Sequence, residues 1–256
     1  MKGKGTGPIE LYYWPGIPGR GEFVRLLLEE AARAYVDVAR ERKNGMAEMM
    51  RFVGGEEPGA LPFAPPFVKA GNAVVSQTAN ILAFLAPRLG LVPRDEALRA
   101  EASQIQLTLA DLVGETHDTH HPIAGSLYYE DQKSAAKQRA HNFLSERLPK
   151  YLEWLEQVLA RNKKSGGRWL VGANLSYVDL STFQIIEGLR YAFPNAMKRL
   201  EPKIPRVIAL RDRVAKRPRI AAYLKSKRRQ SFNQMGIFRH YEELDLPPSR
   251  TRRKRR

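Results

Sequence analysis

Strand-forming patterns occur only in the first third of this chain, and this restricts its possible folds more than any other feature. In residues 9–14, Ile9, Leu11 and Tyr13 fall on one face of a predicted strand, and Tyr12 and Trp14 fall on the other. The next elements follow at short intervals, and Gly71-Asn72 marks a hairpin turn. The pattern predicts a strand, a helix, a strand, a hairpin and a helix at residues 9–14, 22–34, 35–38, 67–75 and 78–89. A short helix is also predicted at 46–52.

Beyond residue 90 the pattern is helical throughout. Gly90 to Pro93 ends the last helix of the first part and predicts a domain boundary. Pro149 predicts a kink or a break within one of the later helices. The predicted helices occupy 97–116, 131–162, 177–193, 205–215 and 218–226. We therefore expect an α/β domain at 8–90, an all-helical domain at 95–230 and a C-terminal extension at 231–256.

The composition excludes several classes of protein. With 256 residues the chain can bury the cores of two small domains. It contains no cysteine, which excludes disulfides, thiolate metal sites and a cysteine nucleophile. No apolar run approaches the length of a bilayer-spanning helix, and the amino-terminal residues do not resemble a secretory signal. We expect a cytoplasmic protein with no membrane partner.

The net charge of +16 is concentrated near the C-terminus. Thirteen Lys and Arg residues lie between Lys198 and Arg229, where the only acidic residues are Glu201 and Asp212. The final segment, 250–256, carries six more. A solvated helix face with a basic tail is the ordinary interpretation of such a pattern. A surface that contacts nucleic acid is the alternative.

Three segments carry a resemblance to a known family. They are Arg-Gly-Glu-Phe-Val-Arg-Leu-Leu-Leu-Glu (20–29), the block from Pro65 to Ala86, and Trp-Leu-Val-Gly-Ala-Asn-Leu-Ser-Tyr-Val-Asp-Leu (169–180). In this order they resemble the cytosolic glutathione transferases over about residues 8–230. The resemblance implies a thioredoxin-like domain followed by an all-α helical-bundle domain. It also implies a homodimer that conjugates the thiolate of glutathione, as co-substrate, to a small hydrophobic electrophile.

Glutathione chemistry requires a donor aimed at the thiol, because a free thiol has a pKa near ~8.5 and is mostly protonated at neutral pH. By resemblance, Tyr13 is the residue that activates the thiol. Tyr12 is its rival, one residue away on the other face of the strand. Trp14 is assigned to glutathione binding by the same resemblance. Arg20 adds positive potential beside the sulfur, unless it is a surface arginine.

The remaining glutathione contacts are also implied by the resemblance. Pro66 matches the family's cis-proline, although Pro65 before it has no N–H to pair with the peptide backbone. A cis bond between Ala64 and Pro65 is the alternative. Gln77 and Thr78 begin a helix, where free N–H groups favour the γ-glutamyl carboxylate.

An acidic residue of the partner subunit holds the γ-glutamyl amine in the family. Asp111 is the candidate here, and Gln106 is the other residue that the alignment permits.

Two further patterns have mainly structural interpretations. Ser176 to Asp179 forms a helix capping box. His117, His120 and His121 lie close in sequence with Glu115 nearby, which is compatible with zinc but is more often polar surface or the lining of a pocket. We predict no metal, and expect these histidines to face the electrophile pocket if they line one.

A second hypothesis keeps the fold and changes the function. A non-catalytic binding or scaffold protein of this family, contacting nucleic acid through its basic C-terminal region, would not need Tyr13. Peroxide reduction and isomerisation use the same thiolate as conjugation, so these patterns do not separate them from it. The identity of the electrophile and the path of residues 232–246 are not predicted.

Overall fold

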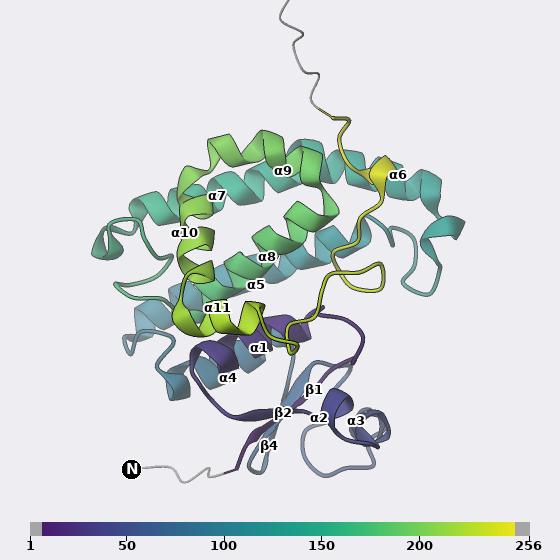
Figure 1. The fold of residues 1–256 in the computed structure, drawn as a ribbon, viewed down its shortest axis with the longest axis vertical. Coiled ribbons are helices and arrows are strands. Elements are labelled where there is room, and N and C mark those ends of the chain that lie inside the picture. The colour runs from purple at the N-terminus through teal and green to yellow at the C-terminus, as the bar shows by residue number, and fades with distance from the viewer. Residues whose placement is uncertain (1–6, 249–256) are drawn as a thin grey trace, which may run out of the picture.

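The computed structural model describes residues 7–248, with one mixed four-stranded sheet below a layer of helices (Figure 1). The strand order is β2-β1-β3-β4. β2 is parallel to β1, whereas β3 is antiparallel to both β1 and β4. The strands span β1 Ile9–Tyr12, β2 Tyr35–Asp37, β3 Phe67–Ala70 and β4 Ala73–Ser76.

The two faces of the sheet bury different sets of side chains because successive residues of a strand point to opposite faces. Leu11 belongs to the large core under α1 (Gly21–Glu30) and α4 (Thr78–Leu89). Tyr12 belongs to a smaller cluster formed with α3 (Gly45–Val53), beside the short helix α2 (Val38–Glu41). The predicted alternation in this strand is therefore confirmed.

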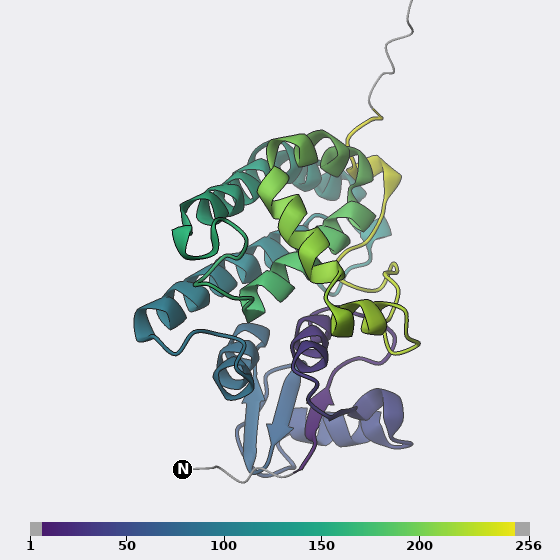
Figure 2. The same cartoon turned by 60° about the vertical axis from the view of Figure 1, so that its left-hand side comes forward.

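The helices that follow α4 form a layer that packs on α1 and α4 (Figure 2). Its central element is α8 (Tyr177–Ala192), which is buried over most of its length. The core is continuous from the sheet to α8, because α1 packs on both α8 and α11. The other α-helices are α5 Glu96–Asp118, α6 Lys133–Asn142, α7 Leu148–Arg161, α9 Pro194–Leu200, α10 Pro205–Ala215 and α11 Pro218–Leu224. Single-turn helices are η1 Tyr129–Asp131, η3 Lys163–Ser165, η4 Glu201–Lys203 and η5 Glu242–Leu244.

One predicted helix was wrong in extent, and another has its irregularity slightly earlier than expected. The first was expected to reach residue 34, but α1 ends at Glu30 and Ala32 has a φ of 50°, which a helix does not permit. The stretch 131–162 was expected to be one helical segment with a kink or break at Pro149. It is divided into α6, a π-helical turn η2 (Phe143–Arg147) and α7, with Pro149 in the first turn of α7, where a proline fits.

The predicted capping box is present at the start of α8. The Ser176 N–H donates to Asp179 Oδ2 at 2.7 Å, and the Leu170 N–H donates to Oδ1 at 2.8 Å. Leu175 and Leu180, on either side of this box, are both buried, as the residues of a hydrophobic staple are. Asp179 therefore ties the preceding loop to the central helix, and its role is structural.

The chain after α11 runs back across the helices, and we call residues 230–248 the C-terminal strap (Figures 1 and 2). Near its start, Asn233 Nδ2 donates to the Gly16 carbonyl at 2.8 Å, in the loop after β1. Ile237 and Phe238 are buried. Asp245 accepts the Asn195 N–H at 2.7 Å at the start of α9. The strap thus contacts both the sheet region and the helical region.

Within residues 7–248, none of the helices has the length and apolar character needed to cross a membrane.

Candidate active site

Tyr13 lies directly after β1, beneath the start of α1. The Arg20 N–H donates to the Tyr13 hydroxyl oxygen at 2.8 Å, and the tyrosine side chain is only 4% exposed. A Cβ at Gly19 would lie 2.1 Å from this hydroxyl, so the glycine is required for the approach. Burial raises the pKa of the Tyr13 phenol, while the Arg20 N–H and the charges of Arg20 and Arg25 act in the opposite direction.

This arrangement has a chemical consequence. The Tyr13 hydroxyl uses an oxygen lone pair to accept the Arg20 N–H, and its own proton stays available for donation. Because the phenol remains protonated at neutral pH, it is a hydrogen-bond donor and not a base. A neutral donor of this kind stabilises a thiolate.

Tyr12 has a different environment on the opposite face of the sheet. Its hydroxyl donates to Glu48 Oε1 at 2.7 Å, and its ring stacks on Phe67 with the centroids 4.4 Å apart. Burial, followed by the contacts with Glu48 and Glu10, raises the pKa of the Tyr12 phenol. Tyr12 is therefore committed to the packing around α3.

One cavity of about 310 Å³ brings together several predicted glutathione-binding residues. Arg20, Gln77 and Thr78 line it, so it lies between the starts of α1 and α4. Gln106 and Ala110 of α5 form the opposite wall. Tyr13 is not among the lining residues, but it is joined to them by its bond with the Arg20 backbone.

The start of α4 has unused hydrogen-bonding capacity. Thr78 Oγ1 is buried and has no hydrogen-bond partner within the described part of the chain. Gln77 is exposed and has a φ of 68°, a left-handed conformation that is uncommon for glutamine. The N-terminus of a helix that presents free N–H groups and a hydroxyl is suited to an anion.

The only cis peptide bond of residues 7–248 lies between Pro65 and Pro66, directly before β3. The assignment of the cis-proline to Pro66 is confirmed, and the alternative at Ala64–Pro65 is wrong. Pro65, which precedes the cis bond, has no N–H, so only carbonyl groups are available there for backbone pairing. Trp14 is exposed at the end of β1.

The two candidates on α5 lie in different places. Gln106 is buried and accepts a hydrogen bond from Ser181 Oγ at 2.7 Å, while also lining the cavity of Arg20 and Thr78. Asp111 lines a separate groove together with Arg147 and Trp154 of the helix packed beside α5. Within one chain, Asp111 is therefore not part of the cavity that holds the other predicted residues.

The three histidines form a cluster at the end of α5. Their ring centroids are 4.8 to 5.0 Å apart. Burial is the main cause that lowers the pKa of His117 to about 4 and that of His120 to about 3. Among the described residues no group of three His, Cys, Asp or Glu side chains has an arrangement suited to a metal ion.

A segment of the site region that the sequence patterns did not place is the strap beside these histidines. The His120 Nε2 lies 2.8 Å from the Ile237 carbonyl oxygen, and Arg239 is near enough for its charge to influence His117. The apolar residues of 232–246 indicated that the segment packs, but nothing in their spacing indicated where.

Five arginines of the basic stretch 198–229 form ion pairs inside the molecule. Arg229 contacts Glu22 at 2.5 Å, Arg228 contacts Glu29 at 2.8 Å, and the Nε of Arg217 contacts Glu30 at 2.7 Å. All three acids lie on α1, so these pairs join α11 and the turn after it to the sheet region. Arg206 and Arg211 pair with Glu156 and Glu187. The predicted basic tail at 250–256 lies outside the described residues.

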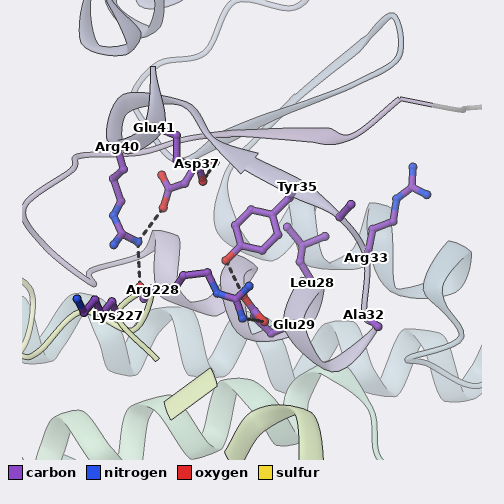
Figure 3. Close-up of a pocket in the computed structure, with 11 residues that line it drawn as sticks. Leu28, Glu29, Ala32, Arg33, Tyr35, Asp37, Arg40, Glu41, Lys227 and Arg228 are labelled. Atoms are coloured by element: carbon purple, nitrogen blue, oxygen red, sulfur yellow. Dashed lines mark hydrogen bonds and ion pairs between the residues drawn. The ribbon is translucent and has the colours of Figure 1, made fainter. Parts of the chain in front are cut away.

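A second hollow, of about 750 Å³, lies beside the edge strand β2 (Figure 3). Its charged side chains pair with one another: Tyr35 and Arg228 both bind Glu29, and Arg40 binds Asp37. None of the predicted site residues lines it. We therefore place the candidate site at the Arg20 and Thr78 cavity.

Comparison with known proteins finds similar proteins among the glutathione transferases. Residues 117–227 match the model of the glutathione S-transferase C-terminal domain. The chain is 24% identical to a glutathione S-transferase of Plasmodium falciparum, over 86% of this chain and 96% of the relative. It is 25% identical to the hematopoietic prostaglandin D synthase of Gallus gallus, over 82% and 92% of the two chains.

The fold agrees with this relationship. The structure of a prostaglandin synthase D of Nilaparvata lugens superposes with a TM-score of 0.66 at 19% identity, covering 86% of this chain and 98% of the other. At this identity the likeness establishes the fold, a thioredoxin-like domain followed by a helical domain. The sequence matches and the fold both make this chain similar to the glutathione transferases.

Proposed function

We propose that this protein is a glutathione transferase that conjugates glutathione to a small electrophile, with Tyr13 as the residue that activates the thiol. The observation that carries the proposal is the position of the Tyr13 hydroxyl. It accepts the Arg20 N–H at 2.8 Å, while Arg20 itself lines the cavity shared with Gln77 and Thr78. A peptide thiol in this cavity lies within reach of a phenol whose proton is free.

In the proposed reaction the Tyr13 hydroxyl donates to the sulfur of glutathione and lowers the pKa of its thiol. Arg20 adds positive potential at the same end of α1, where the helix dipole also favours an anion. The thiolate attacks an electrophilic carbon, a C–S bond forms, and the leaving group departs with the bonding electron pair. The tyrosine proton is shared with the sulfur and is not lost.

The peptide part of glutathione is assigned to the adjoining residues. The γ-glutamyl carboxylate is held by the backbone N–H groups and the unpartnered Thr78 hydroxyl at the start of α4, with Gln77 beside them. The cysteinyl backbone lies against Pro65 and Pro66, where one carbonyl bond replaces the usual pair. Trp14 borders the site.

We propose a homodimer in which Asp111 of the partner subunit holds the γ-glutamyl amine. Large apolar side chains that are unusually exposed support an interface: Phe63 is 88% exposed, Leu61 67% and Leu107 59%. Phe63 and Leu61 lie in the loop before β3, and Leu107 lies on α5 one turn before Asp111. A second copy that covers these side chains would bring α5 close to the loop of its partner.

The division into parts at 8–90, 95–230 and 231–256 also belongs to this proposal, as does a cytoplasmic location. Glutathione is a co-substrate in this scheme, and no metal takes part.

The test is glutathione binding by calorimetry, together with ultraviolet absorbance of the bound thiolate, for wild type, Tyr13→Phe and Tyr12→Phe. We expect binding by all three folded proteins and loss of the thiolate signal in Tyr13→Phe alone, since Tyr12 faces the other side of the sheet. Tyr12→Phe is the matched control for the loss of one hydroxyl. Absence of glutathione binding by wild type would refute the proposal.

A further inference from the structure

The end of α5 and the C-terminal strap together form a polar surface beside the candidate active site. His117 of α5 and His121, three residues after the end of α5, are partly exposed there, with their rings 4.9 Å apart. The strap supplies Arg239, and the start of α1 supplies Arg20. The strap lies against this cluster, because His120 contacts the carbonyl of Ile237, two residues before Arg239, and the charges of both arginines act on His117. Arg20, His117 and Arg239 come from segments more than 90 residues apart in the chain.

The histidines of this surface are held in their neutral forms. Because a carbonyl can only accept, His120 Nε2 carries a proton and donates to the Ile237 oxygen at 2.8 Å. His120 Nδ1 is then an acceptor, buried and without a partner in residues 7–248. Gln132 Nε2 lies 3.3 Å from His121 Nδ1. The histidines therefore add no charge to the surface at neutral pH, and its charge comes from the arginines.

Arg20 and Arg239 differ from most arginines of the helical region. In the described part of the chain, no carboxylate lies within 4.0 Å of either guanidinium. Arg239 donates only to strap carbonyls, with its Nε 2.9 Å from the Gly236 oxygen. Asp118 is 3.8 Å from His117 and 3.9 Å from Arg139, and it is half exposed. Arg20 and Arg239 therefore stay without a paired carboxylate within residues 7–248, although Asp118 lies beside His117.

We propose that this surface binds a carboxylate carried by the electrophile, and that Arg239 is the residue that selects for it. The inference rests on the proposed function and specifies its substrate class. Arg239 and Arg20 supply the opposite charge, and His117 supplies a neutral imidazole that can donate to the same anion. Arg20 also lines the glutathione cavity, so an anion held here lies next to the proposed position of the sulfur.

Matched aromatic compounds test the proposal. The unreactive pair is 3,5-dinitrobenzoate and 1,3-dinitrobenzene, which differ by the carboxylate and are compared by equilibrium binding. The reactive pair is 4-chloro-3,5-dinitrobenzoate and 1-chloro-2,6-dinitrobenzene, which again differ only by the carboxylate. In both reactions the C–S bond forms, the C–Cl bond breaks, and chloride leaves with the bonding pair. The thiol proton passes to solvent and the carboxylate is unchanged.

We expect wild type to bind the benzoate about tenfold more tightly than the neutral compound, and Arg239→Gln to lose that preference. Arg239→Lys should keep most of it, which separates charge from packing because Arg239 also bonds to strap carbonyls. Arg99→Gln is the control for the loss of one positive charge. It lies on the first turn of α5, about 27 Å along the helix from His117.

A second readout does not depend on catalysis. The binding of 3,5-dinitrobenzoate should raise the pKa of His117 from its low value of about 4, as followed by NMR, because the anion compensates the arginine charges. Equal binding of the two unreactive compounds by wild type, or an unchanged preference in Arg239→Gln, would overturn the proposal. Failure of the proposed function is seen separately, because wild type would then not bind glutathione while the benzoate result still decides the anion site.

Discussion

Two sets of arginines have the same chemistry and opposite surroundings. One set flanks α11, and the other lies beside the histidine cluster. Arg217, Arg228 and Arg229 each contact a glutamate of α1. Arg20 and Arg239 have no carboxylate partner among the residues that the structure describes. The first set joins two parts of the molecule. The second set leaves positive charge directed at a surface beside the candidate active site.

The comparison shows that net charge alone is a poor guide to partners. The excess of +11 between residues 198 and 229 indicated a possible nucleic-acid surface, yet the arginines of that stretch that bind α1 are neutralised on folding. Two isolated arginines contribute little to the total charge. They are better candidates for recognition because nothing within the described chain compensates them.

The largest expected loss of stability comes from removing Glu22, the buried partner of Arg229 among the pairs that join α1 to the α11 region. Glu22 is fully buried and accepts hydrogen bonds from Arg25 at 3.2 Å, Tyr223 at 2.6 Å and Arg229 at 2.5 Å. Glu22→Ala should lower the free energy of unfolding by about 3–5 kcal/mol, since it leaves the buried guanidinium of Arg25 with one carboxylate fewer. Urea unfolding measures this change. A loss below about 1 kcal/mol would mean that the pairs do not join the two regions.

The position of the strap should depend on how closely Phe238 packs against α8, so a substitution that adds volume there should displace it. A Cβ at Gly188 of α8 would lie 2.3 Å from the Phe238 ring. Gly188→Ala should displace the strap and lower the free energy of unfolding by about 1–3 kcal/mol. Limited proteolysis between residues 230 and 248 should become faster. Unchanged proteolysis and stability would contradict the observed contact, and Gly114→Ala, at a helical glycine with open space around it, is the control.

The histidine cluster predicts a pH dependence of stability. The pKa of His120 is lowered to about 3 by burial, below its ordinary value of 6.5. Between these values the unfolded chain binds more protons than the folded one, so stability falls as the pH drops below 6.5. From pH 7 to pH 5.5 this residue should account for about 1 kcal/mol.

Comparing wild type with His120→Gln at both pH values isolates that contribution. The comparison is necessary because Asp179, whose pKa burial raises to about 6, changes stability in the opposite direction over the same range. The same pH slope in both proteins would show that His120 is not held neutral by the fold.

The smallest loss of stability should come from removing Arg228, the most exposed of the arginines that pair with α1. Arg228 pairs with Glu29 at 2.8 Å, but most of its side chain is open to solvent. Arg228→Gln should change the free energy of unfolding by less than about 1 kcal/mol, and added salt should reduce even this difference. A loss comparable to that of Glu22→Ala would remove the distinction between the buried and the exposed pairs.

Local sequence patterns determined much of this protein. The bounds of α4 and α10 follow from their apolar spacing and from Thr78, Gly90 and Pro205 at their ends. The alternation in β1 separates Tyr12 from Tyr13, because neighbouring residues of a strand face opposite sides. The capping box before α8 lies within four residues. In each case the interacting groups are close in sequence, so their spacing predicts their contact.

Only the tertiary structure decided where the strap lies and which charges are paired. Glu22 and Arg229 are 207 residues apart, and His120 and Ile237 are 117 apart. No periodicity relates groups at such distances, because their meeting depends on how α1, α5 and α11 pack around one continuous core. The resemblance to the glutathione transferases and the place of Tyr13 after the first strand are therefore predictable from the sequence. The arginine proposed to select the electrophile is identified only from the folded chain.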